Sequence, residues 1–125
     1  MRWFILNKHG QPVECDSVLD WVRWAQQRNG KPLSDESVVE WSHPDRVEPL
    51  RPVLARNATA SSEVTTKFLG TPAGHRRGLP LLFETVILGG QFDGERCRYA
   101  SMGEATIGHW SMVLRAGGLR EDQAG

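Results

Sequence analysis

The apolar residues of this chain fall in short runs separated by glycine, proline and charged residues, which predicts strands more often than helices. Short runs of this kind lie at residues 3–6, 12–14, 37–42, 53–56, 63–69, 81–88 and 95–100. The first two flank a polar turn and predict an N-terminal hairpin. Val64, Thr66 and Phe68 alternate with other residues and should therefore share one face of their strand.

The run at 81–88 is the most apolar in the chain, and its few polar positions predict a central strand buried on both faces. Asp93-Gly94 is a favoured pair for a tight hairpin turn that returns the chain through 95–100. Residues 70–80 hold three glycines and two prolines, and they predict a loop without regular structure.

Helical spacing of apolar residues marks a first helix at about residues 17–28. Asp16 or Ser17 can cap its N-terminus by accepting a backbone hydrogen bond. Asn29-Gly30 then favours a left-handed turn that ends the helix. The apolar positions that recur at helical spacing are Val18, Trp21, Val22 and Ala25.

A second helix is predicted at about residues 102–115, where Ser101 and Glu104 have the spacing of a capping box. Gly117-Gly118 ends it. We expect one continuous core-facing stripe on this helix. Its members would be Ala105, Ile107, His109, Trp110, Met112, Val113 and Leu114.

Together these elements predict an α+β protein, with a small, largely antiparallel sheet of four to six strands packed by two helices, at about 17–28 and 102–115. A chain of 125 residues has the usual size of one domain. We expect residues 1–116 to form this single α+β domain and residues 117–125 to be a frayed or disordered tail.

Charge narrows the classes of partner. Fifteen basic and fifteen acidic residues cancel, and there is no helix-turn-helix pattern, so sequence-specific DNA binding is not expected. Residues 51–80 differ from the rest of the chain because they are locally basic. Their charged residues are Arg51, Arg56, Lys67, Arg76, Arg77 and a lone acidic residue, Glu63. Such a segment can offer a local site to a small anion.

Cysteine use and hydropathy indicate the compartment. Cys15 and Cys97 belong to no CxxC pair, which favours free thiols in a reducing compartment. The apolar run at 3–6 is too short for a signal peptide. No stretch approaches the roughly 18–20 apolar residues that span a bilayer. We therefore expect a soluble cytoplasmic protein without membrane contact.

Motifs for catalysis and metal binding are missing from the sequence. The histidines are far apart and lack HxxxH spacing, at positions His9, His43, His75 and His109. There is no GxSxG, no Walker lysine loop and no GxGxxG after a strand. We expect no metal, no cofactor and no catalytic residue.

Two polar residues stand among apolar ones, and each has two interpretations. Glu84 can form a structural ion pair with Arg96 or Arg98 on the neighbouring strand, or it can be the polar floor of a pocket. His109 can hydrogen-bond within the core. Alternatively it acts as an acid or base with Glu84 or Tyr99 as its partner.

The loop Gly74-His75-Arg76-Arg77-Gly78 also has two interpretations. Its glycines expose backbone amides and its arginines can grip a phosphate, so it can bind an anion. No helix follows it to add a dipole, and as a solvated loop between two strands it needs no ligand.

Residues 63–115 carry a series of short motifs in a fixed order. These are Phe68-Leu69-Gly70, a glycine-rich loop with His75, Pro80-Leu81-Leu82-Phe83-Glu84-Thr85, Gly89-Gly90, Asp93-Gly94, Arg98-Tyr99, Glu104-Ala105 and Gly108-His109. The series resembles a group of small proteins encoded by bacteriophages and prophages. That resemblance implies a setting in the bacterial host cytoplasm and no particular reaction. Where the group usually carries Leu or Ile and then Asp-His, this chain has 71–75, with a histidine and no aspartate.

We therefore expect a phage-type accessory protein that binds a host molecule without catalysis, in an anti-defence role, by sequestering a nucleotide-like anion or by blocking a host protein. The expected ligand-binding residues are His75, Arg76, Arg77, Phe83, Glu84, Tyr99 and His109. One alternative is a homo-oligomeric module that associates with itself through the sheet or through the Trp-bearing helix at about 17–28. Another is a hydrolase-type enzyme that uses His109 and Glu84.

Overall fold

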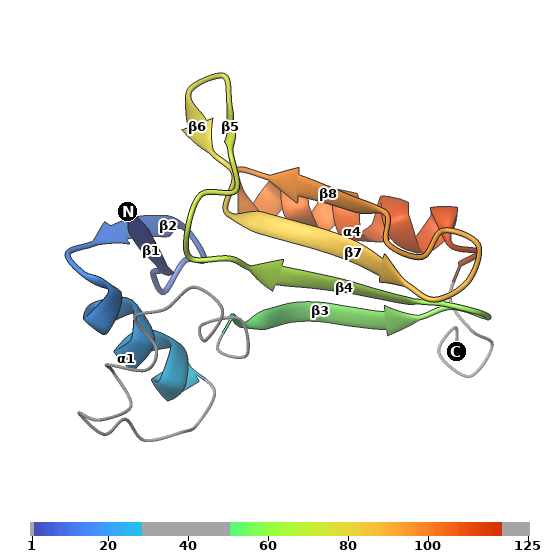
Figure 1. The fold of residues 1–125 in the computed structure, drawn as a ribbon, viewed down its shortest axis with the longest axis horizontal. Helices are drawn as coiled ribbons and strands as arrows, with labels where there is room; N and C mark the ends of the chain where they lie inside the picture. Colours follow the sequence, from blue (N-terminus) through green and yellow to red (C-terminus); the bar gives the residue numbers. More distant parts are fainter. Residues whose placement is uncertain (1, 29–50, 119–125) are drawn as a thin grey trace.

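The computed structural model describes residues 2–28 and 51–118. In chain order the elements are β1 (Trp3–Leu6), β2 (Pro12–Cys15), α1 (Val18–Arg28), β3 (Val53–Ala58), β4 (Glu63–Phe68), β5 (His75–Arg76), β6 (Leu79–Pro80), β7 (Phe83–Leu88), β8 (Arg96–Tyr99) and α4 (Met102–Arg115). The α+β prediction, with largely antiparallel strands and two helices, is confirmed (Figure 1). The strand expected at 37–42 and His43 lie outside the described residues.

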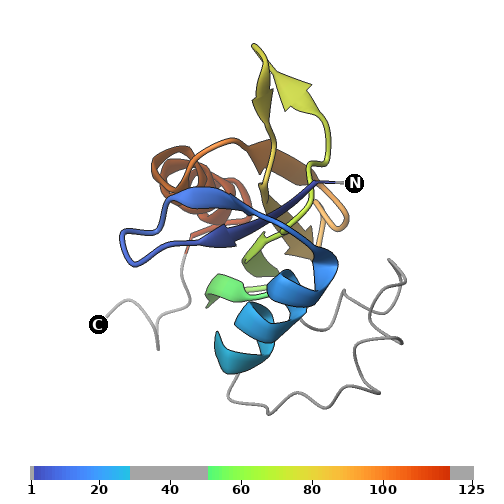
Figure 2. The same ribbon diagram turned by 90° about the vertical axis from the view of Figure 1, so that its left-hand side faces the viewer.

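Four strands form the main sheet, in the order β3-β4-β7-β8, and every neighbouring pair is antiparallel. The helix α4 packs against one face of this sheet and contacts all four strands. Figures 1 and 2 show α4 lying along that side of the sheet. We call this side the inner face and the opposite side the outer face.

Alternation along the strands decides which residues reach each face. Val64, Thr66 and Phe68 of β4 are all buried, as their shared face predicts. Strand β7 is interior to the sheet, as expected, because β4 and β8 flank it. Its burial on both faces was wrongly predicted: on the outer face Glu84 is only part-buried, and Leu88 is 48% exposed.

The predicted hairpin β1–β2 and the helix α1 lie at one end of the main sheet (Figure 2). The Phe4 amide donates to the Gly70 carbonyl at 2.7 Å, and the Phe4 side chain packs in one cluster with Phe68 and Phe83. Gly70 has a φ of +80°, and a Cβ at this position would overlap the indole of Trp21. A side chain at residue 70 would therefore push α1 away from the sheet.

Both helices begin where their capping residues predict. Ser17 Oγ accepts from the Asp20 amide at 3.3 Å at the start of α1. Ser101 Oγ accepts from the Glu104 amide at 3.2 Å at the start of α4. The return bond of the capping box differs from the expected one, because the Glu104 carboxylate accepts from the Ser101 hydroxyl, at 3.2 Å.

The stripe predicted for α4 is only partly correct. Its buried residues face the sheet, and they are Ala105, Gly108, His109, Met112 and Val113. Ile107, Trp110 and Leu114 were expected to widen this stripe, but they are exposed on the other side of the helix. Residues 107, 110 and 114 follow one another at intervals of three and four residues. They therefore form a stripe of their own, which runs parallel to the buried one on the other side of the helix.

Two connections differ from their predictions. The chain between β7 and β8 is a loop at residues 89–95, in which Asp93 Oδ1 accepts from the Gly89 amide at 2.5 Å. Gly94 alone of the expected turn pair has a positive φ, whereas a tight type I′ turn requires both. Within 70–80, expected to be irregular, β5 and β6 pair as a small hairpin that projects from the sheet (Figure 1).

Candidate functional site

A chain of hydrogen bonds crosses the inner face beneath α4. His109 Nε2 lies 2.8 Å from Asn57 Oδ1, and His109 Nδ1 lies 2.7 Å from Thr66 Oγ1. Thr66 Oγ1 lies 2.5 Å from Thr85 Oγ1. Because the Asn57 carbonyl oxygen can only accept, Nε2 carries the proton and Nδ1 accepts from Thr66. The prediction that His109 hydrogen-bonds within the core is confirmed.

Burial influences the protonation of the titratable side chains on the inner face. His109 is 2% exposed, and burial lowers its pKa, which favours the neutral imidazole that these bonds require. The pKa of Tyr99 on β8 is raised, first by burial and then by the neighbouring Cys97, against the opposing effects of Thr85 and Arg76. The side chains of Asn57, His109, Thr66 and Thr85 satisfy one another inside the core, as structural hydrogen bonds do.

The acid–base partnership expected for a hydrolase is not assembled. Glu84 and Thr85 are successive residues of β7, so they point to opposite faces of the sheet. The Glu84 carboxylate is on the outer face, where Arg98 binds it, while His109 and Tyr99 are buried on the inner face. The sheet itself therefore separates Glu84 from His109.

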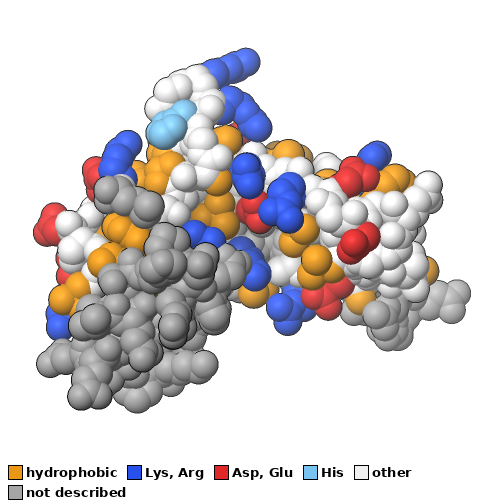
Figure 3. Space-filling view, in the orientation of Figure 1, with side chains coloured by type: hydrophobic (Ala, Val, Ile, Leu, Met, Phe, Trp, Pro, Cys, Tyr) orange, Lys and Arg blue, Asp and Glu red, His pale blue; other side chains and the backbone are white. Residues whose placement is uncertain are grey.

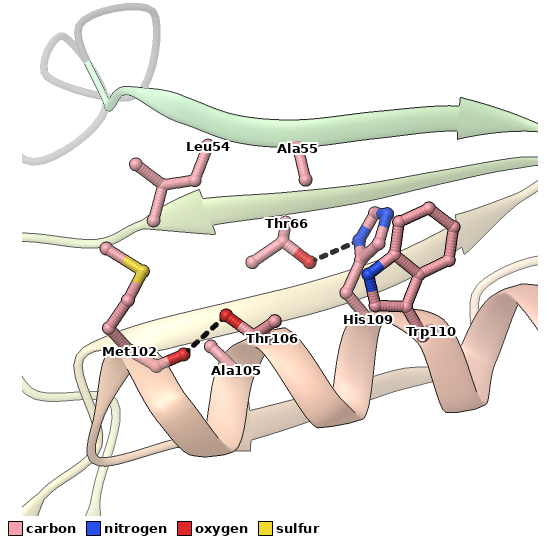
Figure 4. Close-up of a pocket in the computed structure, with 8 residues that line it drawn as sticks. All are labelled: Leu54, Ala55, Thr66, Met102, Ala105, Thr106, His109 and Trp110. Atoms are coloured by element: carbon pink, nitrogen blue, oxygen red, sulfur yellow. Dashed lines mark hydrogen bonds between the residues drawn. The ribbon is translucent and has the colours of Figure 1, made fainter.

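A small cavity of about 90 Å³ lies at the edge of the inner face, between β3 and α4. Figure 4 shows His109 and Thr66 at its base, with Trp110 beside them. The remaining lining residues are Leu54, Ala55, Met102, Ala105 and Thr106. Most of this lining is apolar, and its volume is well below the roughly 300 Å³ of a typical small-molecule site.

The outer face carries a larger and more polar hollow, which we call the outer-face groove. Its volume is about 370 Å³. It lies between the sheet and the loop that follows β4, and it is lined by Arg51, Leu69, Thr71, Pro72, Ala73, Glu84, Arg96 and Arg98. Figure 3 shows basic side chains gathered over this face of the sheet, with acidic ones among them.

Hydrogen bonds hold two of the three cationic groups of the groove, and the third is in an ion pair. Arg51 Nε donates to the Leu69 carbonyl at 2.8 Å, and its Nη2 donates to Thr71 Oγ1 at 3.3 Å. Arg98 Nε donates to Glu84 Oε2 at 2.9 Å, and Arg96 Nη1 approaches Glu84 Oε1 at 3.8 Å. The predicted ion pair of Glu84 is confirmed, and the same carboxylate also forms part of the groove lining.

A second hollow, of about 250 Å³, continues along the outer face and shares Glu84 and Arg96 with the groove. Arg56 and Glu63 form an ion pair there, with Arg56 Nε at 3.2 Å from Glu63 Oε1. Thr65 on the same face is almost fully buried beneath these long charged side chains. The basic surface therefore extends over β3, β4, β7 and β8.

The residues expected to bind ligand fall into three separate places. His75, Arg76 and Arg77 are exposed on the projecting β5–β6 hairpin, where Arg77 has a φ of +53°. Arg76 and Arg77 line a hollow of about 450 Å³ with Glu104 at the base of this hairpin. Glu84 lies in the outer-face groove. The other three are buried on the inner face, and they are Phe83, Tyr99 and His109.

The sequence analysis noted the arginines of the groove but did not predict that they line a binding site. Arg96 and Arg98 were expected solely as ion-pair partners of Glu84, and Arg51 as one of several basic residues in its segment. Arg76 connects the hairpin to the groove, because its Nη2 donates to the Arg98 carbonyl at 3.4 Å. The alternation of Arg96 and Arg98 with Cys97 and Tyr99 was the one signal that two arginines share a face.

Within residues 2–28 and 51–118, no three His, Cys, Asp or Glu side chains lie close enough together to hold a metal ion. Cys15 and Cys97 are free thiols. Neither helix of the described part has the length and apolar character needed to cross a bilayer. No protein-family model matches the chain, and neither a curated protein nor a solved structure matches it.

Proposed function

We propose that this protein is a non-catalytic binding protein that holds an anionic group, such as a phosphate of a nucleotide-like ligand, in the outer-face groove. The observation that carries the proposal is the convergence of three guanidinium groups, those of Arg51, Arg96 and Arg98, on one hollow. Glu84 is the one carboxylate among its described lining residues. The described lining of the groove is therefore cationic, although the whole chain has no net charge.

The chemistry of the lining suits a phosphate. A guanidinium presents a planar fork of N–H donors that matches two oxygens of a phosphate or carboxylate. The hydroxyl of Thr71 adds a neutral donor at the same hollow. A volume of about 370 Å³ falls within the range of small-ligand sites, which begins near 300 Å³.

Preorganisation is a second reason to place the ligand here. Arg51 is held by Leu69 and Thr71, and Arg98 is held by Glu84. Ordering a free arginine at a binding site costs roughly 0.5–1.5 kcal/mol of conformational entropy. That cost is largely met for these two arginines before a ligand arrives, whereas Arg77 on the β5–β6 hairpin is exposed.

The biological setting in this proposal comes from the sequence resemblance to phage- and prophage-encoded proteins. An accessory protein of that kind would act by sequestering a nucleotide-like molecule of the host, which requires binding and no reaction. The proposal keeps the ligand class that the sequence predicts. It replaces the predicted binding residues on the hairpin and the inner face by Arg51, Arg96 and Arg98.

Isothermal titration of the full chain tests this proposal. The panel comprises pyrophosphate, AMP, ATP and a cyclic dinucleotide, with adenosine as the uncharged comparison. We expect heats for phosphate-bearing compounds and none for adenosine. Arg96→Gln should weaken binding by roughly ten- to a hundredfold, because a hydrogen bond to a charged group contributes about 1.5–3 kcal/mol.

Arg77→Gln on the β5–β6 hairpin is the matched control, since it removes the same charge from an exposed position outside the groove lining. Its affinity should equal that of the wild type. Flat heats across the panel would contradict the proposal. A loss of binding in Arg77→Gln but not in Arg96→Gln would also contradict it, and would place the site on the hairpin.

A further inference from the structure

The outward side of α4 is apolar, although the sheet covers only the opposite side of this helix. Ile107 is 72% exposed, Trp110 is 46% exposed and Leu114 is 75% exposed. A single exposed apolar residue needs no explanation, but three in one row on one helix form a surface that water solvates poorly. We call these three residues the α4 stripe.

We infer that the α4 stripe is a self-association surface, on which two copies of this chain pair their α4 helices antiparallel about a two-fold axis. This inference is independent of the proposed function, because the outer-face groove lies on the other side of the sheet. Pairing through α4 leaves that groove accessible in both copies.

The spacing of the stripe is that of a helix–helix seam. Gly103, Ile107, Trp110 and Leu114 follow one another at intervals of four, three and four residues, which is the a/d pattern of paired helices. Gly103 is exposed, and the space around it would be empty even with a Cβ. A second helix can therefore approach closely at this end of the seam.

The polar residues beside the stripe are prepared for burial. Thr106 Oγ1 donates to the Met102 carbonyl at 2.8 Å, and Ser111 Oγ donates to the Ile107 carbonyl at 3.0 Å. Both hydroxyls thus have a partner within their own helix. A second copy can cover them without leaving an unpaired donor, which would otherwise cost about 1–3 kcal/mol.

Charge selects a second copy of the chain in antiparallel orientation. Between residues 105 and 114 the only ionisable side chain is His109, and it is buried against the sheet. Glu104 stands at one end of this uncharged span and Arg115 stands at the other. Arg115 is already paired with Glu95 of its own copy, with Nε at 2.7 Å from Oε1, so the orientation is selected by the helix dipoles, which oppose each other favourably in an antiparallel pair.

The stripe is self-complementary about its own middle. Ile107 and Leu114 lie at equal distances from a point between Trp110 and Ser111, so a two-fold axis there packs each Ile107 against the other copy's Leu114. The two Trp110 rings meet near the axis. Aromatic residues in this central place supply much of the binding energy in many interfaces.

The cavity between β3 and α4 extends the surface beyond the helix. A helix of 14 residues is about 21 Å long, which is short for an interface of about 800 Å² per partner. Trp110 of the stripe and its neighbour Thr106 also line this cavity, and Leu54 and Met102 continue its apolar lining (Figure 4). The interface therefore spans the outward side of α4 and the edge of β3.

Sedimentation velocity of the full chain, from about 1 to 500 µM, tests this inference by mass action. We expect a dimer that forms within this range. Ile107→Glu should raise its dissociation constant by at least about thirtyfold, because it places a charge against the apolar Leu114 of the other copy. Leu79→Lys is the control, since Leu79 is 57% exposed on the β5–β6 hairpin and should leave the dimer unchanged.

A charge swap tests the antiparallel register. Leu114→Lys alone should also weaken the dimer, whereas the double variant Ile107→Glu/Leu114→Lys should recover it by pairing the new charges across the axis. A wild type that stays monomeric throughout would overturn the inference, and so would an Ile107→Glu dimer of wild-type affinity. A double variant as weak as the single ones would overturn the antiparallel arrangement.

Discussion

Gly108 of α4 shows how the absence of a single side-chain atom allows two elements to pack closely. It packs directly on Tyr99 of β8, and a Cβ at residue 108 would overlap the phenol ring and its hydroxyl. Tyr99 is itself buried, so the ring has little room to move. The close approach of α4 to the sheet therefore depends on the absence of a side chain at this position.

Gly108→Ala should lower the free energy of unfolding by up to about 2 kcal/mol, since the overlap costs about 1–3 kcal/mol while alanine adds roughly 1 kcal/mol of helix propensity. Urea denaturation measures this. Gly103→Ala in the same helix is the control, because a Cβ there meets nothing within 4 Å. It should be neutral or stabilising, and equal losses in both variants would refute the packing argument.

His109 should make stability depend on pH. Burial lowers its folded pKa, so below about pH 6.5 the unfolded chain binds a proton more readily than the folded one. The free energy of unfolding should therefore be full above this pH and fall as the pH drops towards the folded pKa, with a slope of at most about 1.4 kcal/mol per pH unit.

Denaturation of the wild type and of His109→Gln at pH 7.5, 6.5 and 5.5 isolates the contribution of His109 to the pH dependence. The variant should be less stable at pH 7.5, because its bonds to Thr66 and Asn57 are altered. Its decline between pH 6.5 and 5.5 should be shallower. Parallel curves for the two proteins would show that His109 does not carry the pH dependence.

The N-terminal cap of α4 contributes to the stability of the whole helix. Ser101→Ala removes the acceptor for the Glu104 amide and should cost about 1 kcal/mol of stability. Ser111→Ala is the matched control within the same helix, because the Ser111 hydroxyl only donates to the carbonyl of Ile107. That change should be neutral or stabilising by up to about 0.5 kcal/mol, since alanine is the better helix former. Thermal unfolding of both variants at low concentration measures the difference.

Elements whose signals are local were predictable from the sequence. Capping serines and apolar spacing located both helices to within one residue, and alternation placed Val64, Thr66 and Phe68 on one face. The prediction for α4 was only partly correct because it merged two apolar stripes into one, although Ala105, His109 and Met112 do face the sheet as expected. Ile107, Trp110 and Leu114 repeat with the same period as the buried residues, so only packing distinguishes the two sides.

The candidate site was only partly predictable, because it combines a strand pairing that the sequence indicates with a distant residue that it does not. Glu84 lies opposite Arg98 in the pairing of β7 with β8, and this pairing was anticipated. Arg51 joins the same groove through bonds to Leu69 and Thr71, about twenty residues away in the chain, and no local pattern indicates them. Grouping Glu84 with Phe83 and His109 failed because successive strand residues point to opposite faces.

On the scale of the whole molecule, the positive and negative charges are equal in number, but basic side chains gather around the outer-face groove. The chain carries no net charge, so long-range attraction should contribute little to ligand capture. Any anion in the groove is held by local contacts with partly exposed arginines, which salt screens. Raising the salt from about 0.05 M to 0.5 M should therefore weaken pyrophosphate binding several-fold, as measured by titration. An affinity independent of salt would argue against ionic contacts.

The most direct test of the account is to map where an anion binds. Pyrophosphate added to the isotopically labelled full chain should shift the NMR amide signals of residues 69–73 and 96–98, together with the Arg96 and Arg98 side-chain Nε–H signals. Signals at the tip of the β5–β6 hairpin and around His109 should stay in place. The absence of saturable shifts, or shifts confined to residues 75–79, would contradict binding in the outer-face groove.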